Sequence, residues 1–216
     1  MKTFKQIADQ FNCDKANGHV YHEIYPLYIE QFRDKEFTLF EIGIDQGKSF
    51  ELWKQYFPLA KIYGMDIGKE FKTDRGEVFK GDQSKLEDLK QITDKIGKCQ
   101  LIIDDGSHFP EHQILTFEYL FNDVLTNNGV YIIEDTKCSY WHPQRKIYDY
   151  PSGYLNLIDY FTKYNHKVNH QYNGFDNSLN IKTITFGPNC IIITKGDVND
   201  SEKNEWYMRQ HYITQI

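Results

Sequence analysis

The sequence predicts a single α/β domain built on a mostly parallel sheet. From residue 38 to residue 133, short apolar runs alternate with longer amphipathic stretches, which is the pattern of strands joined by helices. The last two apolar runs are separated only by Gly187-Pro188-Asn189, and so short a connection requires an antiparallel hairpin. A chain of 216 residues suits one well-buried domain better than two. We therefore treat residues 1–216 as one domain, with residues 1–35 as a helical lead-in or lid.

The elements follow in order along the chain. Apolar residues at helical spacing predict helices over residues 3–11 and 22–33, with a polar loop from Asp14 to His19 between them. The expected strands are 38–42, 61–65, 77–80, 100–103, 129–133, 182–186 and 190–194, and the later expected helices are 48–57, 85–96, 110–124 and 154–164.

Composition excludes several function classes. The formal net charge is −6 and basic residues do not cluster, whereas binding to nucleic-acid phosphates needs clustered Lys and Arg. No apolar run has the length of a membrane span or a signal peptide. The four cysteines are scattered along the chain, which is typical of reduced thiols. We therefore expect a cytoplasmic protein without a nucleic-acid or membrane partner.

A glycine loop and acids at successive strand ends predict a nucleoside site. The first strand continues into the segment Glu41–Gly47, where Gly43 and Gly47 allow a sharp turn and close approach of a ligand. Asp66 ends the next strand and can accept hydrogen bonds from ribose hydroxyls. Asp82 follows the third strand and can accept one from an adenine amino group. The candidate cofactor-binding residues are Glu41, Gly43, Gly47, Asp66, Asp82, Gln83 and Asp104.

The same loop argues against a dinucleotide. The dinucleotide fingerprint is G-x-G-x-x-G, but position 45 is Asp45, whose charge would repel a pyrophosphate. A nucleoside joined to an amino acid, without phosphate, suits this loop better. A nicotinamide-dependent oxidoreductase stays open as the alternative enzyme class.

Two acidic clusters predict a metal site with a base beside it. The fourth strand ends in Asp104-Asp105-Gly106-Ser107-His108 and the fifth in Glu134-Asp135-Thr136. Asp105, Glu134 and Asp135 could bind one hard cation such as Mg²⁺, and His108 could act as a general base. The competing interpretation is that the acids cap turns and His108 packs under a loop, although burying so many ionisable groups would be costly. A metal- or sugar-binding protein without turnover is therefore a second alternative.

These segments, followed by Ser139-Tyr140-Trp141, resemble the metal-dependent sugar O-methyltransferases of the mycinamicin and demethylmacrocin type. The resemblance begins near Asp14-Lys15 and runs to the last hairpin. It implies a Rossmann-like class I methyltransferase fold with a seven-stranded sheet whose last strand is antiparallel. It also implies the following roles: S-adenosylmethionine held by the Gly43 loop, Asp66 and Asp82; Mg²⁺ held by Asp105, Glu134 and Asp135; and His108 as the base that deprotonates a sugar hydroxyl.

The resemblance implies a small-molecule acceptor that contains a sugar. Macrolide-modifying members carry an additional N-terminal domain, whereas here a short helical lead-in precedes the first strand. A glycosylated natural product and a surface-polysaccharide precursor both stay open as acceptors, and so does a homo-oligomer. The segment Tyr140–Tyr154 is expected to form part of the acceptor wall. The loop with His19 and Tyr21 could close over the site, and His112 is either a supporting residue or a helix-face residue.

Overall fold

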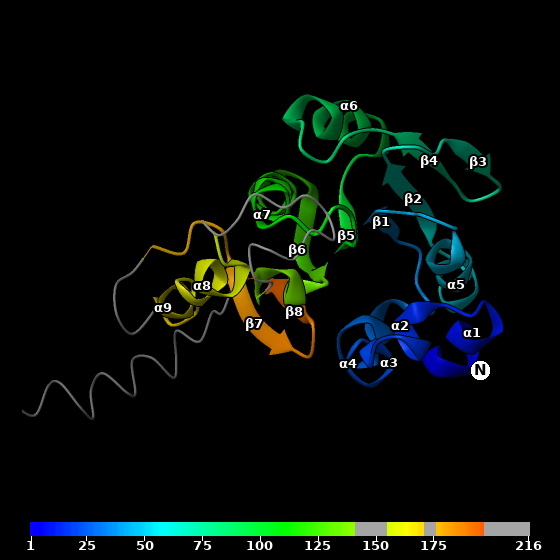
Figure 1. The fold of residues 1–216 in the computed structure, drawn as a ribbon, viewed down its shortest axis with the longest axis horizontal. Coiled ribbons are helices and arrows are strands. Elements are labelled where there is room, and N and C mark those ends of the chain that lie inside the picture. The colour runs from blue at the N-terminus through cyan, green and yellow to red at the C-terminus, as the bar shows by residue number, and fades with distance from the viewer. Residues whose placement is uncertain (141–154, 171–175, 197–216) are drawn as a thin grey trace, which may run out of the picture.

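The computed structural model describes residues 1–140, 155–170 and 176–196. In these residues an eight-stranded sheet, in the order β3-β4-β2-β1-β5-β6-β8-β7, carries helices on both faces (Figure 1). The strands are β1 (Thr38–Ile42), β2 (Lys61–Asp66), β3 (Phe71–Thr73), β4 (Gly76–Lys80), β5 (Cys99–Asp104), β6 (Leu125–Glu134), β7 (Ile181–Gly187) and β8 (Cys190–Lys195). The helical elements are α1 (Phe4–Gln10), α2 (Asp14–Asn17), α3 (Tyr21–Ile24), α4 (Pro26–Ile29), η1 (Glu30–Phe32), α5 (Lys48–Tyr56), α6 (Leu86–Ile96), α7 (Pro110–Tyr119), η2 (Leu120–Val124), η3 (Thr136–Tyr140), α8 (Leu157–Thr162) and α9 (Asn165–Val168).

The sheet is mostly parallel and ends in an antiparallel hairpin, as predicted. Strands β4, β2, β1, β5 and β6 pair in parallel, whereas β8 runs antiparallel to both β6 and β7. The eighth strand is β3, which pairs antiparallel with β4. Seven strands were expected because β3 has only three residues, and Phe71 and Lys72 in it are exposed, so it leaves no apolar run in the sequence.

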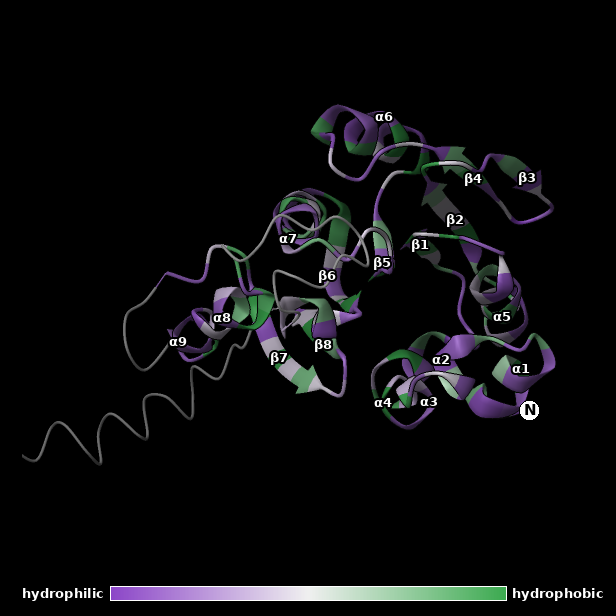
Figure 2. Ribbon diagram, in the orientation of Figure 1, coloured by the Kyte–Doolittle hydropathy of each residue, from purple (hydrophilic) through white to green (hydrophobic). Residues whose placement is uncertain are grey.

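Each face of the sheet has its own apolar core. Alternate residues of β1 point to opposite sides, so Leu39 joins the core under α1–α5 and Phe40 joins the core under α6, α7 and α8. Side chains of the central strands are buried on both faces. In Figure 2 the amphipathic helices α5 and α6 carry both hydrophobic and hydrophilic stretches. Burial of the central strands on both faces explains the continuous apolar runs in the sequence.

The helical lead-in differs from its prediction. The single helix expected over 22–33 is divided into α3, α4 and η1, and Pro26 is the first residue of α4. Proline lacks an N–H and fits a first helical position, so it starts a new helix there. The expected polar loop at 14–19 contains α2. In the helix expected over 154–164, α8 spans Leu157–Thr162.

The carboxyl ends of the parallel strands lie together at one edge of the sheet. The register pairs Ile42 with Asp104 and Asp104 with Ile133, so the loops after β1, β5 and β6 are neighbours. Ligands bind at this edge in open α/β sheets. Among the described residues, no helix combines the length and the apolar character needed to cross a membrane.

Candidate active site

The loop after β1 packs directly against the loop after β5. Gly43 has a φ of +85°, and a Cβ added there would lie 2.0 Å from the carbonyl oxygen of Asp105. Gly47 has a φ of +78° and caps the start of α5, but a Cβ there would meet nothing within 4 Å. Gly43 is therefore required by both conformation and space, and Gly47 by conformation alone.

Asp66 fixes the conformation of this loop. Its Oδ2 accepts hydrogen bonds from the backbone N–H groups of Ile44 (3.0 Å) and Asp45 (3.1 Å). Its Oδ1 accepts one from Gly68 N–H at 2.8 Å. Burial alone would raise the pKa of Asp66, but these donors outweigh it and hold the pKa below its ordinary value. The carboxylate is therefore ionised where it faces the neighbouring pocket.

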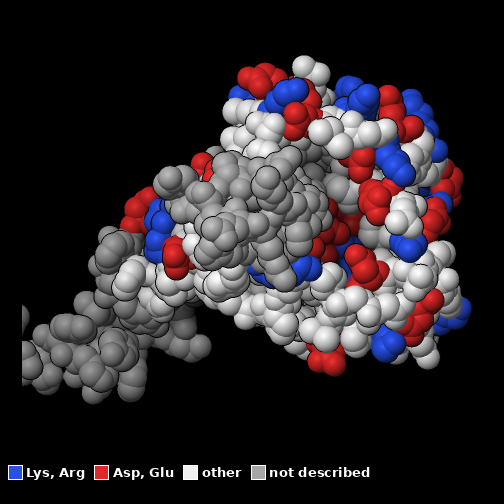
Figure 3. All heavy atoms as spheres, viewed as in Figure 1, with Lys and Arg blue, Asp and Glu red and all other residues white. Residues whose placement is uncertain are grey.

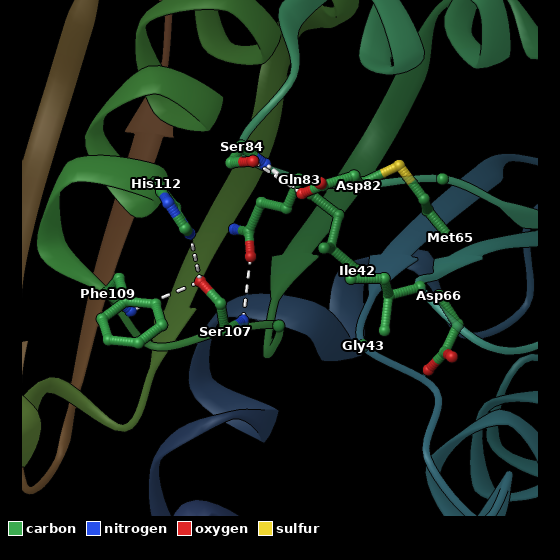
Figure 4. A pocket seen from close by; sticks show the side chains of 13 residues that line it. Ile42, Gly43, Met65, Asp66, Asp82, Gln83, Ser84, Ser107, Phe109 and His112 are labelled. Atoms are coloured by element: carbon green, nitrogen blue, oxygen red, sulfur yellow. Dashed lines mark hydrogen bonds between the residues drawn. The ribbon is translucent and has the colours of Figure 1, made fainter. Parts of the chain in front are cut away.

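A largely apolar pocket of about 380 Å³ lies beside this loop (Figure 4). Its volume lies in the range of small-molecule sites, about 300–1,000 Å³. It is lined by Ile42, Gly43, Met65, Asp66, Ile67, Gly81, Asp82, Gln83, Ser84, Gly106, Ser107, Phe109 and His112. The strand-end residues predicted to hold a nucleoside, Asp66 and Asp82, both line it.

Gln83 and Asp104 build the wall of this pocket. Gln83 Nε2 donates to Asp104 Oδ1 at 2.6 Å and to Thr116 Oγ1 at 3.2 Å, and its Oε1 accepts from Ser107 N–H at 2.9 Å. Gln83 thus joins the loops after β4 and β5 to α7. Asp104 is fully buried, is not among the lining residues, and burial raises its pKa to about 7. Of these two predicted cofactor residues, Gln83 is on the wall and Asp104 lies behind it.

Two polar pairs complete the apolar pocket. Asp82 Oδ1 accepts from the N–H and Oγ–H of Ser84, at 3.0 and 2.7 Å, and the Ser84 hydroxyl is the main cause that lowers the pKa of Asp82. In the second pair, His112 Nδ1 and Ser107 Oγ lie 2.9 Å apart (Figure 4). His112, which the sequence left undecided, therefore belongs to the pocket wall.

Glu41 is buried in β1, just before the loop that begins at Gly43. It is fully buried, and its two oxygens accept hydrogen bonds from Trp53 Nε1 and Ser49 Oγ, both at 2.9 Å. Because Trp53 and Ser49 belong to α5, Glu41 joins that helix to β1. Burial raises its pKa to about 7. The structure thus places this predicted cofactor residue behind the loop.

A polar pocket of about 420 Å³ adjoins the apolar one. The two pockets share Gly43, Asp66 and Gly106. Acidic atoms line the hollow in the middle of the face drawn in Figure 3. The polar pocket is lined by Asn12, Asp14, Gly43, Ile44, Asp45, Gln46, Lys48, Ser49, Asp66, Asp105, Gly106, His108 and Asp135. Asn12 and Asp14 come from the helical lead-in, and the sequence by itself assigned neither of them to a site.

Asp105, His108 and Asp135 converge in the polar pocket. One ligand atom from each lies within 4.8 Å of the others, and His108 Nε2 is 3.7 Å from Asp135 Oδ2. Two carboxylates and one imidazole form a donor set that suits a divalent cation. The two carboxylates therefore fit the predicted metal, and the imidazole of His108 lies beside them.

Glu134 is not among the residues that line the polar pocket, but Lys15 links it to Asp105. It is buried, and its Oε1 accepts a hydrogen bond from Lys15 Nζ at 2.6 Å. Lys15 also donates to Asp105 Oδ2 at 2.8 Å. Burial alone would lower the pKa of Lys15, but the neighbouring carboxylates, Asp105 first, raise it, so the side chain stays an ammonium. Lys15 stands at the start of the family resemblance, but the sequence by itself assigned it no role, because its short polar segment has no periodic signal that indicates burial.

Asp135 is held by several neighbours. Asn189 Nδ2 donates to Asp135 Oδ1 at 2.5 Å, and Lys137 Nζ lies 3.2 Å from the same oxygen. Burial alone would raise the pKa of Asp135. The nearby His108 and Lys137 and the hydrogen bond from Asn189 outweigh burial, so the pKa lies below its ordinary value. His19 Nε2 is 3.5 Å from Oδ1, so the predicted lid loop does reach the site. The sequence by itself assigned Asn189 no role in the site. Its place in the Gly-Pro-Asn turn is nevertheless typical of a residue with left-handed backbone, which Asn189 has.

Comparison with known proteins gives related sequences among sugar O-methyltransferases. No family model matches the chain. The 8-demethyl-8-α-L-rhamnosyl tetracenomycin-C 2′-O-methyltransferase of Streptomyces olivaceus is 34% identical over 66% of this chain and 40% of its own length. The mycinamicin VI 2″-O-methyltransferase of Micromonospora griseorubida is 33% identical over 57% of this chain and 33% of its own length. The chain thus spans well under half the length of the curated relatives it matches.

Solved structures of a methyltransferase are similar to this chain over a larger part of its length. The MycE methyltransferase from the mycinamycin biosynthetic pathway, in complex with Mg and SAH, superposes with a TM-score of 0.80 at 25% identity, covering 92% of this chain and 56% of that one. Its complex with Mg, SAH and mycinamycin VI gives a TM-score of 0.79 at the same identity, over 92% of this chain and 55% of that one. The predicted Rossmann-like methyltransferase fold and the resemblance to macrolide and sugar O-methyltransferases are both confirmed.

Proposed function

We propose that this chain is an S-adenosylmethionine-dependent, metal-assisted O-methyltransferase that acts on a hydroxyl of a sugar or of a glycosylated small molecule. One observation carries the proposal: an apolar, nucleoside-sized pocket adjoins a polar pocket in which the carboxylates of Asp105 and Asp135 converge with the imidazole of His108. Both pockets share Gly43, Asp66 and Gly106. A sulfonium methyl group at that boundary would face the side on which His108 lies. The related methyltransferases support the same assignment.

The nucleoside part of the cofactor is assigned to the apolar pocket. The ionised Asp66 would accept hydrogen bonds from the ribose hydroxyls, and Asp82 would contact the adenine end. Met65 and Phe109 offer apolar surface to a flat base. The amino-acid part would extend along the Gly43–Gly47 loop toward the start of α5, where free N–H groups favour a carboxylate. Glu41, Gln83 and Asp104 would keep the wall and the loop in place from behind.

The acceptor chemistry is assigned to the polar pocket. Asp105 and Asp135 would hold the Mg²⁺, and Glu134 adds negative charge behind Asp105; its direct ligation of the metal stays a prediction. When bound, Mg²⁺ would lower the pKa of a nearby hydroxyl. His108 takes the proton of the acceptor hydroxyl at Nε2. S-adenosylmethionine would supply the methyl group: transfer from its sulfonium sulfur to the acceptor oxygen would break the carbon–sulfur bond and leave S-adenosylhomocysteine.

Positioning supplies most of the proposed rate enhancement. Methyl transfer from a sulfonium needs an aligned nucleophile, and orientation of two reactants contributes on the order of 7–11 kcal/mol in favourable cases. Base catalysis typically adds about 10²–10⁴-fold. The lead-in helices pack into the same core as β1 and line the polar pocket through Asn12 and Asp14. This packing supports treating the lead-in and the sheet as one catalytic unit, and the acidic net charge supports a small-molecule acceptor over a nucleic acid.

The test separates cofactor binding from metal-dependent turnover. We expect S-adenosylhomocysteine to bind in a calorimetric titration with or without EDTA. We expect transfer of a labelled methyl group from S-adenosylmethionine to glycosylated acceptors to stop in EDTA and resume with Mg²⁺. Asp105→Asn should lose the response to Mg²⁺ but keep S-adenosylhomocysteine binding. Methyl transfer that persists in EDTA would contradict the role of the metal, and binding of NADH in place of S-adenosylhomocysteine would favour the oxidoreductase alternative.

A further inference from the structure

The ammonium group of Lys15 lies among carboxylates from three strand ends. Its Nζ is 2.6 Å from Glu134 Oε1, 2.8 Å from Asp105 Oδ2 and 3.7 Å from Glu41 Oε1. The Lys15 side chain is fully buried, as is Glu41, and Glu134 is nearly so. Asp105 is the exception, because its side chain is 22% exposed and lines the polar pocket. Lys15 thus connects the buried acids to the one that faces a ligand.

Packing of the lead-in fixes the position of this ammonium. Lys15 belongs to α2, and its neighbours Cys13 and Ala16 are buried in the core that also contains β1 and α5. A buried lysine loses hydration, and this loss is offset only where charged partners surround it. Asp105 and Glu134 would repel each other without a cation between them. The ammonium is therefore a charge partner that both carboxylates share.

We propose that Lys15 is a positioning residue for the metal site: it binds Asp105 from behind and so holds that carboxylate beside His108 and Asp135. The inference rests on the proposed function, because the cation in question is the proposed Mg²⁺. Metal ligands are commonly oriented by a hydrogen-bonded neighbour, and loss of that neighbour typically lowers metal affinity about 10–100-fold. Through Lys15, the helical lead-in takes part in the construction of the site.

The sign of the effect distinguishes this role from simple electrostatics. A positive charge near a cation site repels the metal, so its removal should tighten binding if Lys15 acts only as a charge. If Lys15 positions Asp105, its removal should weaken binding, because the carboxylate is free to turn away. The two outcomes are opposite and can be measured directly.

Lys195 offers a matched control in the same chain. It is also buried, and its Nζ donates to the backbone carbonyl oxygens of Phe121, Asn122 and Leu125 at 2.6, 3.0 and 3.1 Å. These partners lie before and at the start of β6, whereas the proposed site lies at its end. Lys195→Met should therefore lower stability without affecting the metal site.

The experiment compares wild type, Lys15→Met and Lys195→Met by Mn²⁺ titration, with S-adenosylhomocysteine binding and thermal unfolding measured in parallel. We expect Lys15→Met to bind Mn²⁺ at least tenfold more weakly and to keep its S-adenosylhomocysteine affinity. We expect Lys195→Met to bind Mn²⁺ as wild type does. Equal or tighter Mn²⁺ binding by Lys15→Met would overturn the inference and leave the proposed function standing. A wild type that binds S-adenosylhomocysteine but no Mn²⁺ would overturn the metal site and the inference together.

A second measurement needs no substitution at Lys15. In wild-type protein with ¹⁵N-labelled lysine, buried ammonium groups give resolvable signals, and Lys195→Met identifies the signal of Lys195. We expect Mg²⁺ to shift the Lys15 signal and to leave the Lys195 signal in place. Saturating Mg²⁺ that moves neither signal would contradict the inference even if Lys15→Met fails to fold.

Discussion

His108 Nε2 lies 3.7 Å from Asp135 Oδ2, and both residues have a left-handed backbone, with φ values of +60° and +55°. For residues other than glycine this conformation costs on the order of 1–2 kcal/mol each. The rest of the fold must hold the pair against that cost. Two strained residues whose side chains meet in a polar pocket are typical of a functional site.

We expect His108→Ala to lower turnover by about 100-fold or more, because a base typically contributes at least that factor. S-adenosylhomocysteine affinity should change little, since His108 lines the polar pocket and not the apolar one. His112→Ala is the matched control: it lines the apolar pocket and should weaken S-adenosylhomocysteine binding more than it affects turnover. Initial rates and calorimetry measure both effects. Wild-type turnover in His108→Ala would remove His108 as the base.

Asn189 should contribute to keeping Asp135 ionised. Asn189→Asp replaces the amide donor, 2.5 Å from Asp135 Oδ1, with a second carboxylate, and this raises the pKa of the pair. A raised pKa in the folded state stabilises the protein at low pH and loses that contribution as pH rises. We therefore expect Asn189→Asp to be about 1–3 kcal/mol less stable than Asn189→Gly at pH 8, with a smaller difference at pH 4.

The comparison with Asn189→Gly removes the effect of backbone conformation. Asn189 has a φ of +60°, a conformation that aspartate and glycine both adopt. Urea unfolding in EDTA at the two pH values gives the free energies. A difference that does not depend on pH would show that the two carboxylates do not interact.

Gly43→Ala and Gly47→Ala should differ sharply in effect. Both glycines have positive φ, so alanine costs on the order of 1 kcal/mol at either position from conformation alone. Only at Gly43 does the added Cβ meet backbone, the Asp105 carbonyl oxygen at 2.0 Å. We expect Gly43→Ala to lose S-adenosylhomocysteine binding and considerably more stability, and Gly47→Ala to lose only the smaller amount of stability. Calorimetry and urea unfolding measure both, and equal losses in the two variants would contradict the close packing of the loops.

Asp104 should make the stability of the metal-free protein depend on pH. Burial raises its pKa in the folded state to about 7, whereas an unfolded aspartate titrates near pH 3.9. Between these values the folded state holds the proton more tightly, so the free energy of unfolding falls as pH rises from about 4 to 7. Asp104→Asn removes this group and should flatten the curve. A residual slope is expected from Glu41, whose pKa is also about 7.

Urea titrations from pH 4.5 to 7.5 in EDTA check this prediction. Asn keeps an acceptor for the Gln83 amide, so the wall of the apolar pocket should persist, and S-adenosylhomocysteine binding serves as the control. Parallel stability curves for wild type and Asp104→Asn would mean that Asp104 titrates at the same pH in the folded and unfolded states.

The sequence was sufficient for the architecture and for the edge at which the site lies. Burial of the central strands on both faces leaves continuous apolar runs, and these runs predicted seven of the eight strands. Because the carboxyl ends of parallel strands meet at one edge, the order of residues along the chain was enough to bring Asp66, Asp82, Asp105 and Asp135 together there. The predicted aromatic acceptor wall, apart from Tyr140, lies outside the described residues.

The tertiary structure alone decided which side chains face the pockets. Glu134 and Asp135 are adjacent in sequence, yet Glu134 binds Lys15 in the interior and Asp135 faces His108. The contacts of Lys15 with Asp105 and Glu134 span 90 and 119 positions of the chain. A local sequence pattern records the periodicity of a strand or helix, but the pairing of buried charges depends on which distant segments pack together. The order of the acids can therefore be read from the sequence, whereas only packing separates the acids that line the pockets from those that are buried beside them.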